Sequence, residues 1–276
     1  MIRSAHATDL VAIAEIAIAT GQLEDWSGRN PAYVEHLMRV GRVLVAEDAG
    51  RLTGFGAVQE IGTVRVLCDL FVDPAAHGTG IGRALLAELW RDAPRRMTFS
   101  SQHAHALPLY TSFGLDPWWP LLYLRGDAGA LPFPAGWSTV GSTAEQVGAL
   151  EHDWTGVDRT ADHRAWAARP NGAAVIVLRD GAVAAAGTAA GPWEDFGLVH
   201  LAVAPEAGDV AAAAVIASLA GLAGPGPVTG VCLPGPHPAV RPLLAAGWRV
   251  QEFDLFMASE PGLLDPRRAV PSPGQA

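Results

Sequence analysis

The sequence predicts an α/β (α+β) chain of two similar units, each a mixed, mainly antiparallel sheet flanked by helices. Short apolar strands alternate with amphipathic helices along the chain, and each half contains one hairpin signal. The motif Phe71-Val72-Asp73-Pro74 has a counterpart 131 positions later (202 − 71), Ala202-Val203-Ala204-Pro205. Tyr110…Gly114 has a counterpart 133 positions later (243 − 110), Leu243…Gly247. Two landmarks at nearly one offset indicate a duplicated unit.

Capping residues, turn residues and apolar periodicity set the expected elements of the first half. Thr8 or Asp9 can cap a first helix, Pro31 can open a second, and Asp48-Ala49-Gly50 can form a hairpin turn. The expected strands are 2–4, 42–47, 51–59, 64–72, 96–101 and 118–125. The expected later helices are 81–90 and 104–113.

The second half is expected to follow the same order around a hairpin at Arg179-Asp180-Gly181. The expected helices are 143–153, 158–168, 209–222 and 238–246, and the expected strands are 173–178, 182–190, 198–204, 228–232 and 248–258.

Glycine and proline mark the boundaries between the expected units. A Gly- and Pro-rich linker at 126–136 separates a first domain, 1–125, from a second domain, 137–260. The segment 261–276 lacks periodicity and is expected to be a flexible tail.

Composition excludes several classes of protein. All 19 basic residues are arginine, so a P-loop lysine and Schiff-base chemistry are ruled out. The formal net charge of −9 disfavours nucleic acid and anionic membranes as partners.

The two cysteines, Cys68 and Cys232, are far apart and form no metal-ligand spacing. We therefore expect no disulfide framework and no metal, and a reducing, cytoplasmic location. The start of the chain lacks a signal-peptide pattern, and the longest apolar run, 211–224, is shorter than the ~20 residues of a membrane span.

One stretch carries the chemistry. A buried strand ending at Val72 runs into the turn His77-Gly78-Thr79-Gly80-Ile81-Gly82, and an apolar helix follows at once. Main-chain N–H groups at such a helix start, together with the helix dipole, can bind an anion, and glycine lets a phosphate approach closely. The alternative is a plain strand-to-helix turn. The glycine spacing does not fit a dinucleotide-binding fingerprint.

This turn and a second motif together resemble the GNAT superfamily of acyl-CoA-dependent N-acyltransferases. The family has Arg/Gln-x-x-Gly-x-Gly/Ala after a strand and Ala-x-x-x-Tyr-x-x-x-Gly-Phe downstream, where this chain has 77–82 and Ala106…Tyr110…Gly114-Leu115. The resemblance covers residues 1–125. It departs at His77, which replaces Arg or Gln, and at Leu115, which replaces Phe.

The resemblance implies a donor site for acetyl-CoA or another acyl-CoA. It implies that the turn binds the pyrophosphate and that the pantetheine lies along a strand that splays from its neighbour at a bulge. The cofactor-binding residues implied in this way are Leu70, Phe71, Val72, His77, Gly78, Thr79, Gly80, Ile81, Gly82, Arg83 and His103.

The resemblance also implies catalytic roles for two residues. Tyr110 would protonate the leaving thiolate, which a phenol with an ordinary pKa near 10 can do at neutral pH. Asp69 would bind the acceptor ammonium or accept its proton. The alternative to these catalytic roles is a purely structural one, in which Tyr110 is an aromatic residue of the core and Asp69 forms a salt bridge within the sheet. Cys68 could carry an acyl group by ping-pong transfer, although a buried core thiol is the more ordinary role.

The resemblance also implies an acceptor pocket walled by Trp26 and Trp118, with Asp69 as a substrate-binding residue. The second unit is expected to be degenerate, because Leu243 replaces Tyr110 and Asp209 occupies the turn. His200 and His237 are expected to be structural.

The function expected from these residues is direct transfer of an acyl group, most simply acetyl, from coenzyme A to a primary amine of a small molecule. The protein would act as a monomer or homodimer. Two alternatives are the same fold with a carrier-protein donor, and a non-catalytic acyl-CoA-binding protein.

Overall fold

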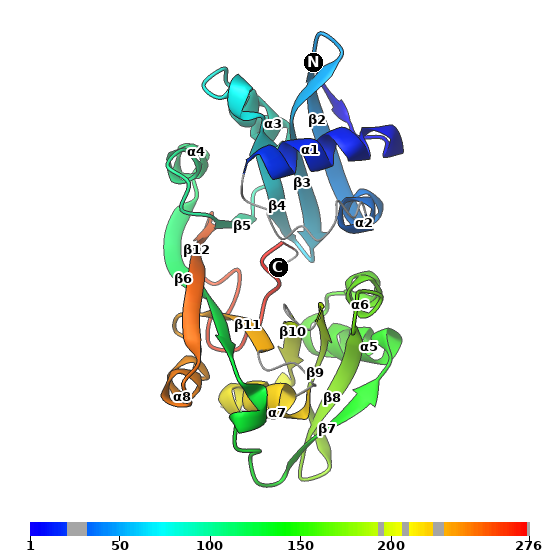
Figure 1. Cartoon of the computed structure of the whole chain (residues 1–276), viewed down its shortest axis with the longest axis vertical. Coiled ribbons are helices and arrows are strands. Elements are labelled where there is room, and N and C mark those ends of the chain that lie inside the picture. The colour runs from blue at the N-terminus through cyan, green and yellow to red at the C-terminus, as the bar shows by residue number, and fades with distance from the viewer. Residues whose placement is uncertain (21–31, 193–195, 206–209, 223–228, 275–276) are drawn as a thin grey trace.

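The computed structural model describes residues 1–20, 32–192, 196–205, 210–222 and 229–274. Within them, one continuous sheet of 12 strands runs through the molecule in the order β1-β2-β3-β4-β5-β12-β6-β11-β10-β9-β8-β7 (Figure 1). The mixed, mainly antiparallel sheet flanked by helices is thereby confirmed. The two expected sheets are joined edge to edge into one.

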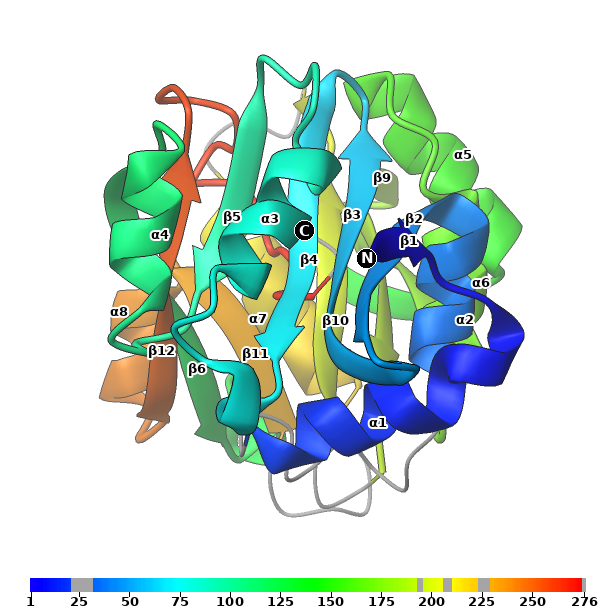
Figure 2. The same cartoon turned by 90° about the horizontal axis from the view of Figure 1, so that it is seen from above.

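The first half places helices on both faces of its part of the sheet. Apolar residues of α1 and α2 pack on one face with Phe55, whereas α3 and α4 pack on the other face with Leu44 and Leu67. Figure 2 shows α3 lying across β4. The elements are β1 (Ile2–Ser4), α1 (Leu10–Ala19), α2 (Ala32–Val40), β2 (Gly41–Asp48), β3 (Arg51–Ile61), β4 (Val64–Val72), α3 (Ile81–Leu89), β5 (Arg96–Ser100), α4 (Ala106–Ser112) and β6 (Asp116–Gly126).

The second half repeats this plan. Its largest core lies beneath α7 and α8, and α5 and α6 pack on the other side against β8 and β9. The elements are β7 (Trp137–Ser142), α5 (Ala144–Thr155), α6 (Thr160–Ala167), β8 (Ala173–Arg179), β9 (Ala182–Ala190), β10 (Gly197–Val203), α7 (Ala211–Gly221), β11 (Thr229–Pro234), α8 (Val240–Ala245) and β12 (Arg249–Ala258).

The two halves exchange their last strands. The final strand of the second half, β12, pairs with β5 of the first half, and β6 pairs with β11 of the second half. The two exchanged strands then pair with each other, antiparallel, at the centre of the sheet. Division of the chain at the linker therefore does not divide the sheet, because each half completes the other.

The exchange obeys a local pseudo-twofold symmetry. Phe99 lies opposite Phe256, and the equivalent positions, Cys232 and Tyr123, also lie opposite each other. Cys232 follows Phe99 by 133 positions (232 − 99), and Phe256 follows Tyr123 by the same 133 positions (256 − 123). The axis passes between Leu121 and its own counterpart Asp254, which are paired across the centre. This register confirms the duplication expected from the sequence.

Two segments expected to be loose are packed instead. In the linker, Ala128 and Leu131 are buried in the second core. The segment expected to be a flexible tail runs between the halves (Figure 1), where Val270 is fully buried and its carbonyl accepts a hydrogen bond from Leu201 N at 3.3 Å. The Tyr33 hydroxyl donates to Gly274 O at 2.9 Å. Tertiary contacts order a segment that has no periodic pattern of its own.

Strand β7 was not predicted. Its six residues are only partly buried and lie at the edge of the sheet, so they lack the apolar alternation that marks a central strand. Among the described residues, no helix has the length and apolar character needed to cross a bilayer.

We expect Phe256→Ala to lower the free energy of unfolding by about 3–5 kcal/mol, because a buried aromatic at the exchanged strand would leave a cavity. Phe256 is 1% exposed and stacks on Trp119 with ring centroids 4.3 Å apart. Urea unfolding measures the loss. The control Val250→Ala, on the same strand but 41% exposed, should change stability by less than about 1 kcal/mol. Equal effects of the two substitutions would contradict a central role for β12.

Candidate active site

Strands β4 and β5 separate part-way along their length. They pair in parallel only as far as Leu67 and Thr98, where the Thr98 hydroxyl donates to Leu67 O at 3.0 Å. On the other side of β4, Val58 lies opposite Leu67 and Ala57 lies opposite Asp69. Cys68 is therefore the extra residue of a β-bulge, which bends the strand away from β5. Main-chain groups of β4 beyond this point are not paired with β5.

The glycine-rich turn lies at the far end of β4. Gly78 and Gly80 have φ angles of +78° and +86°, which glycine adopts without strain, and a Cβ at either position would meet open space. Gly80 caps α3 without any side-chain hydrogen bond to the helix. The first N–H groups of α3 thus have no side-chain acceptor and are available to an anion.

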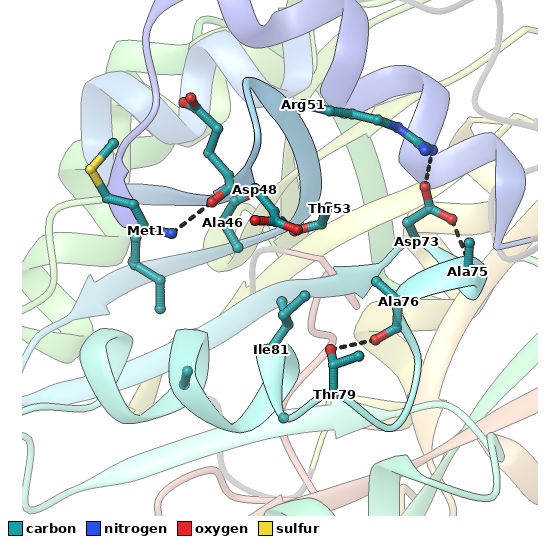
Figure 3. A pocket seen from close by; sticks show the side chains of 14 residues that line it. Met1, Ala46, Asp48, Arg51, Thr53, Asp73, Ala75, Ala76, Thr79 and Ile81 are labelled. Carbon is teal, nitrogen blue, oxygen red and sulfur yellow. Dashed lines mark hydrogen bonds and ion pairs between the residues drawn. The ribbon is translucent and has the colours of Figure 1, made fainter.

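Neighbouring side chains fix the shape of the turn. The Thr79 hydroxyl donates to Ala76 O at 2.7 Å, and the Asp73 carboxylate accepts from Ala75 N at 2.9 Å. Arg51 pairs with Asp73. Figure 3 shows these groups around a cavity of about 540 Å³ on the outer side of the turn, where it meets the β2–β3 hairpin.

Three histidines gather beside the turn. The ring of His77 lies 3.0 Å from Val72 O, and its centroid is 6.1 Å from that of His103 and 6.3 Å from that of His105. The predicted cofactor residues His77 and His103 are therefore brought together. Arg83 instead points to α4, where its guanidinium donates to Ser112 Oγ at 2.9 Å.

Tyr110 lies on α4 and is 8% exposed. Its ring packs 6.0 Å from the ring of Trp90, among the apolar residues between α3 and the sheet. Burial raises the pKa of its phenol, and the carboxylates of Asp69 and Asp254 raise that pKa further. The phenol is thus kept protonated at neutral pH.

Asp69 lies at the bulge, on the face of the sheet opposite to Leu70. Its Oδ2 atom is buried and has no hydrogen-bond partner among the described residues. Burial raises the pKa of this carboxyl to about 7, and the nearby Tyr33 hydroxyl opposes the rise. A carboxylate with a pKa near 7 is matched to general-base chemistry at neutral pH.

Cys68 is not suited to carry an acyl group. Burial, and then the charge of Asp69, raise the pKa of its thiol well above the ordinary value. The thiolate is the nucleophilic form, so a raised pKa makes the side chain less reactive.

The two tryptophans predicted for the acceptor pocket do not join this group. Trp26 lies outside the described residues. Trp118 is on β6, which β5 and β12 separate from β4, and its indole donates to Ala258 O at 3.3 Å.

Residues that the sequence reasoning missed come from elsewhere. Tyr33 of α2 lies next to Asp69. Asp254 and Tyr123, from the exchanged strands, lie across β5 from Asp69 and are joined by a hydrogen bond of 2.7 Å. An acidic residue within the apolar run Phe253-Asp254-Leu255-Phe256 was a signal available in the sequence.

Comparison with known proteins agrees with this geometry. Residues 39–114 match a family model described as an acetyltransferase (GNAT) domain. This segment of the chain is similar to GNAT acetyltransferase domains. No curated protein matches the sequence.

Solved structures share the GNAT fold across both halves of the chain. A proposed acetyltransferase from Pyrococcus horikoshii matches with a TM-score of 0.72 at 15% identity, covering 100% of this chain and 95% of that chain. A tandem GNAT protein from the clavulanic acid biosynthesis pathway has a TM-score of 0.63 at 15% identity (96% and 99% covered). A GCN5-related N-acetyltransferase from Sphaerobacter thermophilus has a TM-score of 0.58 at 16% identity (97% and 98% covered). The chain therefore has two GNAT-like folds in tandem.

The second GNAT-like fold keeps the strand geometry of the first half but has different side chains at the positions equivalent to Asp69 and Tyr110. Strand β10 repeats the register shift of β4, and β10 pairs with β11 only at its first two positions. His200 stands where Asp69 stands in the first half (200 − 69 = 131), and the fully buried Leu243 stands where Tyr110 stands. The turn around Asp209 lies outside the described residues.

A buried polar cluster occupies the bulge of the second half. Glu151 Oε2 lies 2.7 Å from His163 Nε2, and Glu151 Oε1 lies 2.9 Å from His200 Nε2. Thr188 Oγ1 lies 2.8 Å from His163 Nδ1. The three potential ligand atoms of Glu151, His163 and His200 lie within 4.8 Å of one another, but they already bond to each other.

His237, also buried, accepts a hydrogen bond from Ala239 N at 3.1 Å. Each of these histidines has at least one partner in the fold, while His200 Nδ1 and His237 Nε2 are buried without a hydrogen-bond partner among the described residues.

A second buried cluster joins the two halves beside the first-half bulge. Asp162 of α6 accepts hydrogen bonds from His36 of α2 at 2.7 Å and from Gln59 of β3 at 2.9 Å, and pairs with Arg159 at 3.2 Å. Burial alone would raise the pKa of Asp162, but these partners outweigh it and lower that pKa.

We expect Asp162→Asn to destabilise the protein by about 3–5 kcal/mol, because it removes the buried anion that pairs with Arg159 and accepts hydrogen bonds from His36 and Gln59. Thermal or urea unfolding checks this. Asp153→Asn, at an exposed position on α5, is the matched control and should change stability by less than about 0.5 kcal/mol. A loss no larger than that of the control would show that the cluster does not hold the halves together.

Proposed function

We propose that the protein is an acyl-CoA-dependent N-acyltransferase that transfers an acetyl group from acetyl-CoA directly to a primary amine of a small molecule. The observation that carries the proposal is the placement of Asp69 near Tyr110, just beyond the point where β4 and β5 stop pairing. One supplies a carboxylate with a pKa near 7 and the other a phenol kept protonated by burial.

The donor side of the proposal uses the turn and the splayed strand. The N–H groups at the start of α3 would bind the diphosphate of the cofactor, and the open space at Gly78 and Gly80 allows its oxygens to approach the main chain. The pantetheine would pair with β4 beyond Leu67, where β5 no longer does. The thioester would then lie between the bulge and α4.

The reaction is a direct aminolysis. Asp69 accepts a proton from the bound ammonium, and the freed amine nitrogen forms a bond to the thioester carbon. The C–S bond breaks as the tetrahedral intermediate collapses, and the Tyr110 hydroxyl gives its proton to the departing thiolate. The nitrogen of the intermediate loses its extra proton to the resulting tyrosinate, which restores Tyr110, and Asp69 releases its proton to solvent. The products are the amide and free coenzyme A. Direct transfer is favoured over an acyl-cysteine route because the Cys68 thiol stays protonated.

The charge of the chain supports an amine acceptor. A protein with a net charge of −9 attracts cations, and the unpartnered Oδ2 of Asp69 needs a donor. The experiment that separates an enzyme from a binding protein is release of free thiol from acetyl-CoA across a panel of primary amines. The proposal would be contradicted if acetyl-CoA bound to the protein but no amine in the panel caused the release of free thiol from it.

We expect Tyr110→Phe to lower kcat by about 10²–10⁴-fold, because the leaving thiolate loses its proton donor. Acetyl-CoA binding, measured by calorimetry, should change little, since the substitution removes one hydroxyl and keeps the packed ring. An unaltered kcat would remove Tyr110 from the mechanism.

We expect kcat/KM to depend on the ionisation of Asp69. Because the carboxylate is the active base and its pKa is about 7, log kcat/KM should rise with a slope of one below pH 7 and level off above it. Asp69→Asn should lower the plateau by about 10²–10⁴-fold and abolish the inflection near pH 7. Asp48→Asn, at an exposed hairpin turn, is the control. An unchanged profile in Asp69→Asn would assign the base to another group.

A further inference from the structure

The first-half site contains a second acidic side chain that belongs to the second half of the chain. Asp254 lies on β12, opposite Leu121 of β6, and its Oδ2 accepts a hydrogen bond from the Tyr123 hydroxyl at 2.7 Å. Its side chain is only partly buried, and burial nevertheless raises its pKa. The strand exchange alone brings it to the first half.

The register of three strands places Asp254 beside the reacting groups. Leu67, Thr98 and Met257 form one row across β4, β5 and β12, and this row ends the regular pairing of β4 with β5. Asp69 lies two residues beyond the row on β4. Because β12 is antiparallel to β5, Asp254 lies three residues beyond it in the same direction. The two carboxylates thus flank the end of β5.

Both carboxylates also project from the same face of the sheet. Side chains alternate along a strand, so Asp69 points away from Leu70 and Asp254 points away from Leu255. Leu70 and Leu255 both pack into the core beneath α3 and α4, which puts Asp69 and Asp254 on the opposite face. Both carboxylates raise the pKa of the Tyr110 phenol, which places both of them near that side chain.

Neither carboxylate has a salt-bridge partner among the described residues. The nearest charged neighbour of Asp254 that affects its ionisation is another acid, Glu252, and its one hydrogen-bond donor is the neutral Tyr123. Half-buried anions without a counter-ion are costly, so a bound cation would be stabilised here.

We infer that Asp254 is a specificity-determining residue of the acceptor site, and that the acceptor carries a second cationic group besides the amine that is acylated. One amino group reacts between Asp69 and Tyr110, and a second ammonium group binds Asp254. This inference rests on the proposed function. Strands on either side of one intervening strand lie about 10 Å apart, so a diamine whose nitrogens are on the order of 5–10 Å apart would reach both carboxylates.

The test uses two acceptors that differ only in the second charge, 1,5-diaminopentane and n-pentylamine, with thiol release as the readout. The full-length protein should prefer the diamine by at least about tenfold in kcat/KM. Asp254→Asn should raise KM for the diamine by about 10–100-fold and leave kcat, and the monoamine parameters, within about twofold. The matched control is Asp116→Asn, at an exposed aspartate at the other end of the β6–β12 pair. It should leave kcat and KM unchanged for both substrates.

Two outcomes would overturn the inference. Equal use of the two amines by the unmodified protein would exclude a second cation, and an equal fall in kcat for both amines in Asp254→Asn would assign Asp254 to support of Tyr110. Acetyl-CoA binding and the unfolding temperature show whether the variant is folded. If Asp254→Asn fails to fold, the second variant is Tyr123→Phe, which frees Asp254 Oδ2 and should increase the affinity for the diamine. An unchanged affinity for the diamine in Tyr123→Phe would count against the inference.

Failure of the proposed function is distinguishable from failure of this inference. If no amine causes release of thiol from acetyl-CoA, the proposed function fails. Calorimetry with the same two amines in the presence of coenzyme A still tests whether Asp254 binds the second ammonium group. Tighter binding of the diamine that is lost in Asp254→Asn would support the site without catalysis. Equal binding of the two amines would overturn it.

Discussion

The pairing of β6 with β12 at the centre of the sheet is the interaction on which the rest of the structure depends. Each strand leaves its own half and completes the other, so the core of the first half contains Phe256 and Met257 from the end of the chain. Neither half has a complete sheet without the other. The pseudo-twofold register shows that the two exchanges are equivalent, as expected for a unit that was duplicated and then fused.

The candidate site follows from a local defect in this regular sheet. The extra residue Cys68 bends β4, its pairing with β5 ends, and main-chain groups on that edge of β4 are no longer paired with β5. The same bulge brings Asp69 beside Tyr33 and near the phenol of Tyr110. A low-polarity environment then moves the pKa values of the acid and the phenol upward together. The carboxyl is left poised near neutrality and the phenol fully protonated.

The second half has the same backbone geometry at its bulge but different side chains at the equivalent positions. Its bulge and its splayed strands persist, but an imidazole replaces the carboxylate and a leucine replaces the tyrosine. Both carboxylate oxygens of Glu151 bond to the histidines, Oε2 to His163 and Oε1 to His200. In the first half, by contrast, a buried carboxylate oxygen remains without a partner. Retained backbone geometry with altered side chains is consistent with a second copy that supports the first, through β12 and the Asp162 cluster.

The sequence by itself determined the local features: the duplicated order of elements, the glycine turn at the start of α3, and the helix that carries Tyr110. These depend on spacings of a few residues, which the chain displays directly. Asp69 was also singled out as a candidate, from its place on the strand that leads into the turn. Only the tertiary structure decided which copy of each last strand pairs with which half, because duplicated strands present similar apolar patterns to similar edges. For the same reason it alone revealed Asp254 at the site, the joint at Asp162 and the packing of the last residues, all of which depend on contacts between segments more than 100 positions apart.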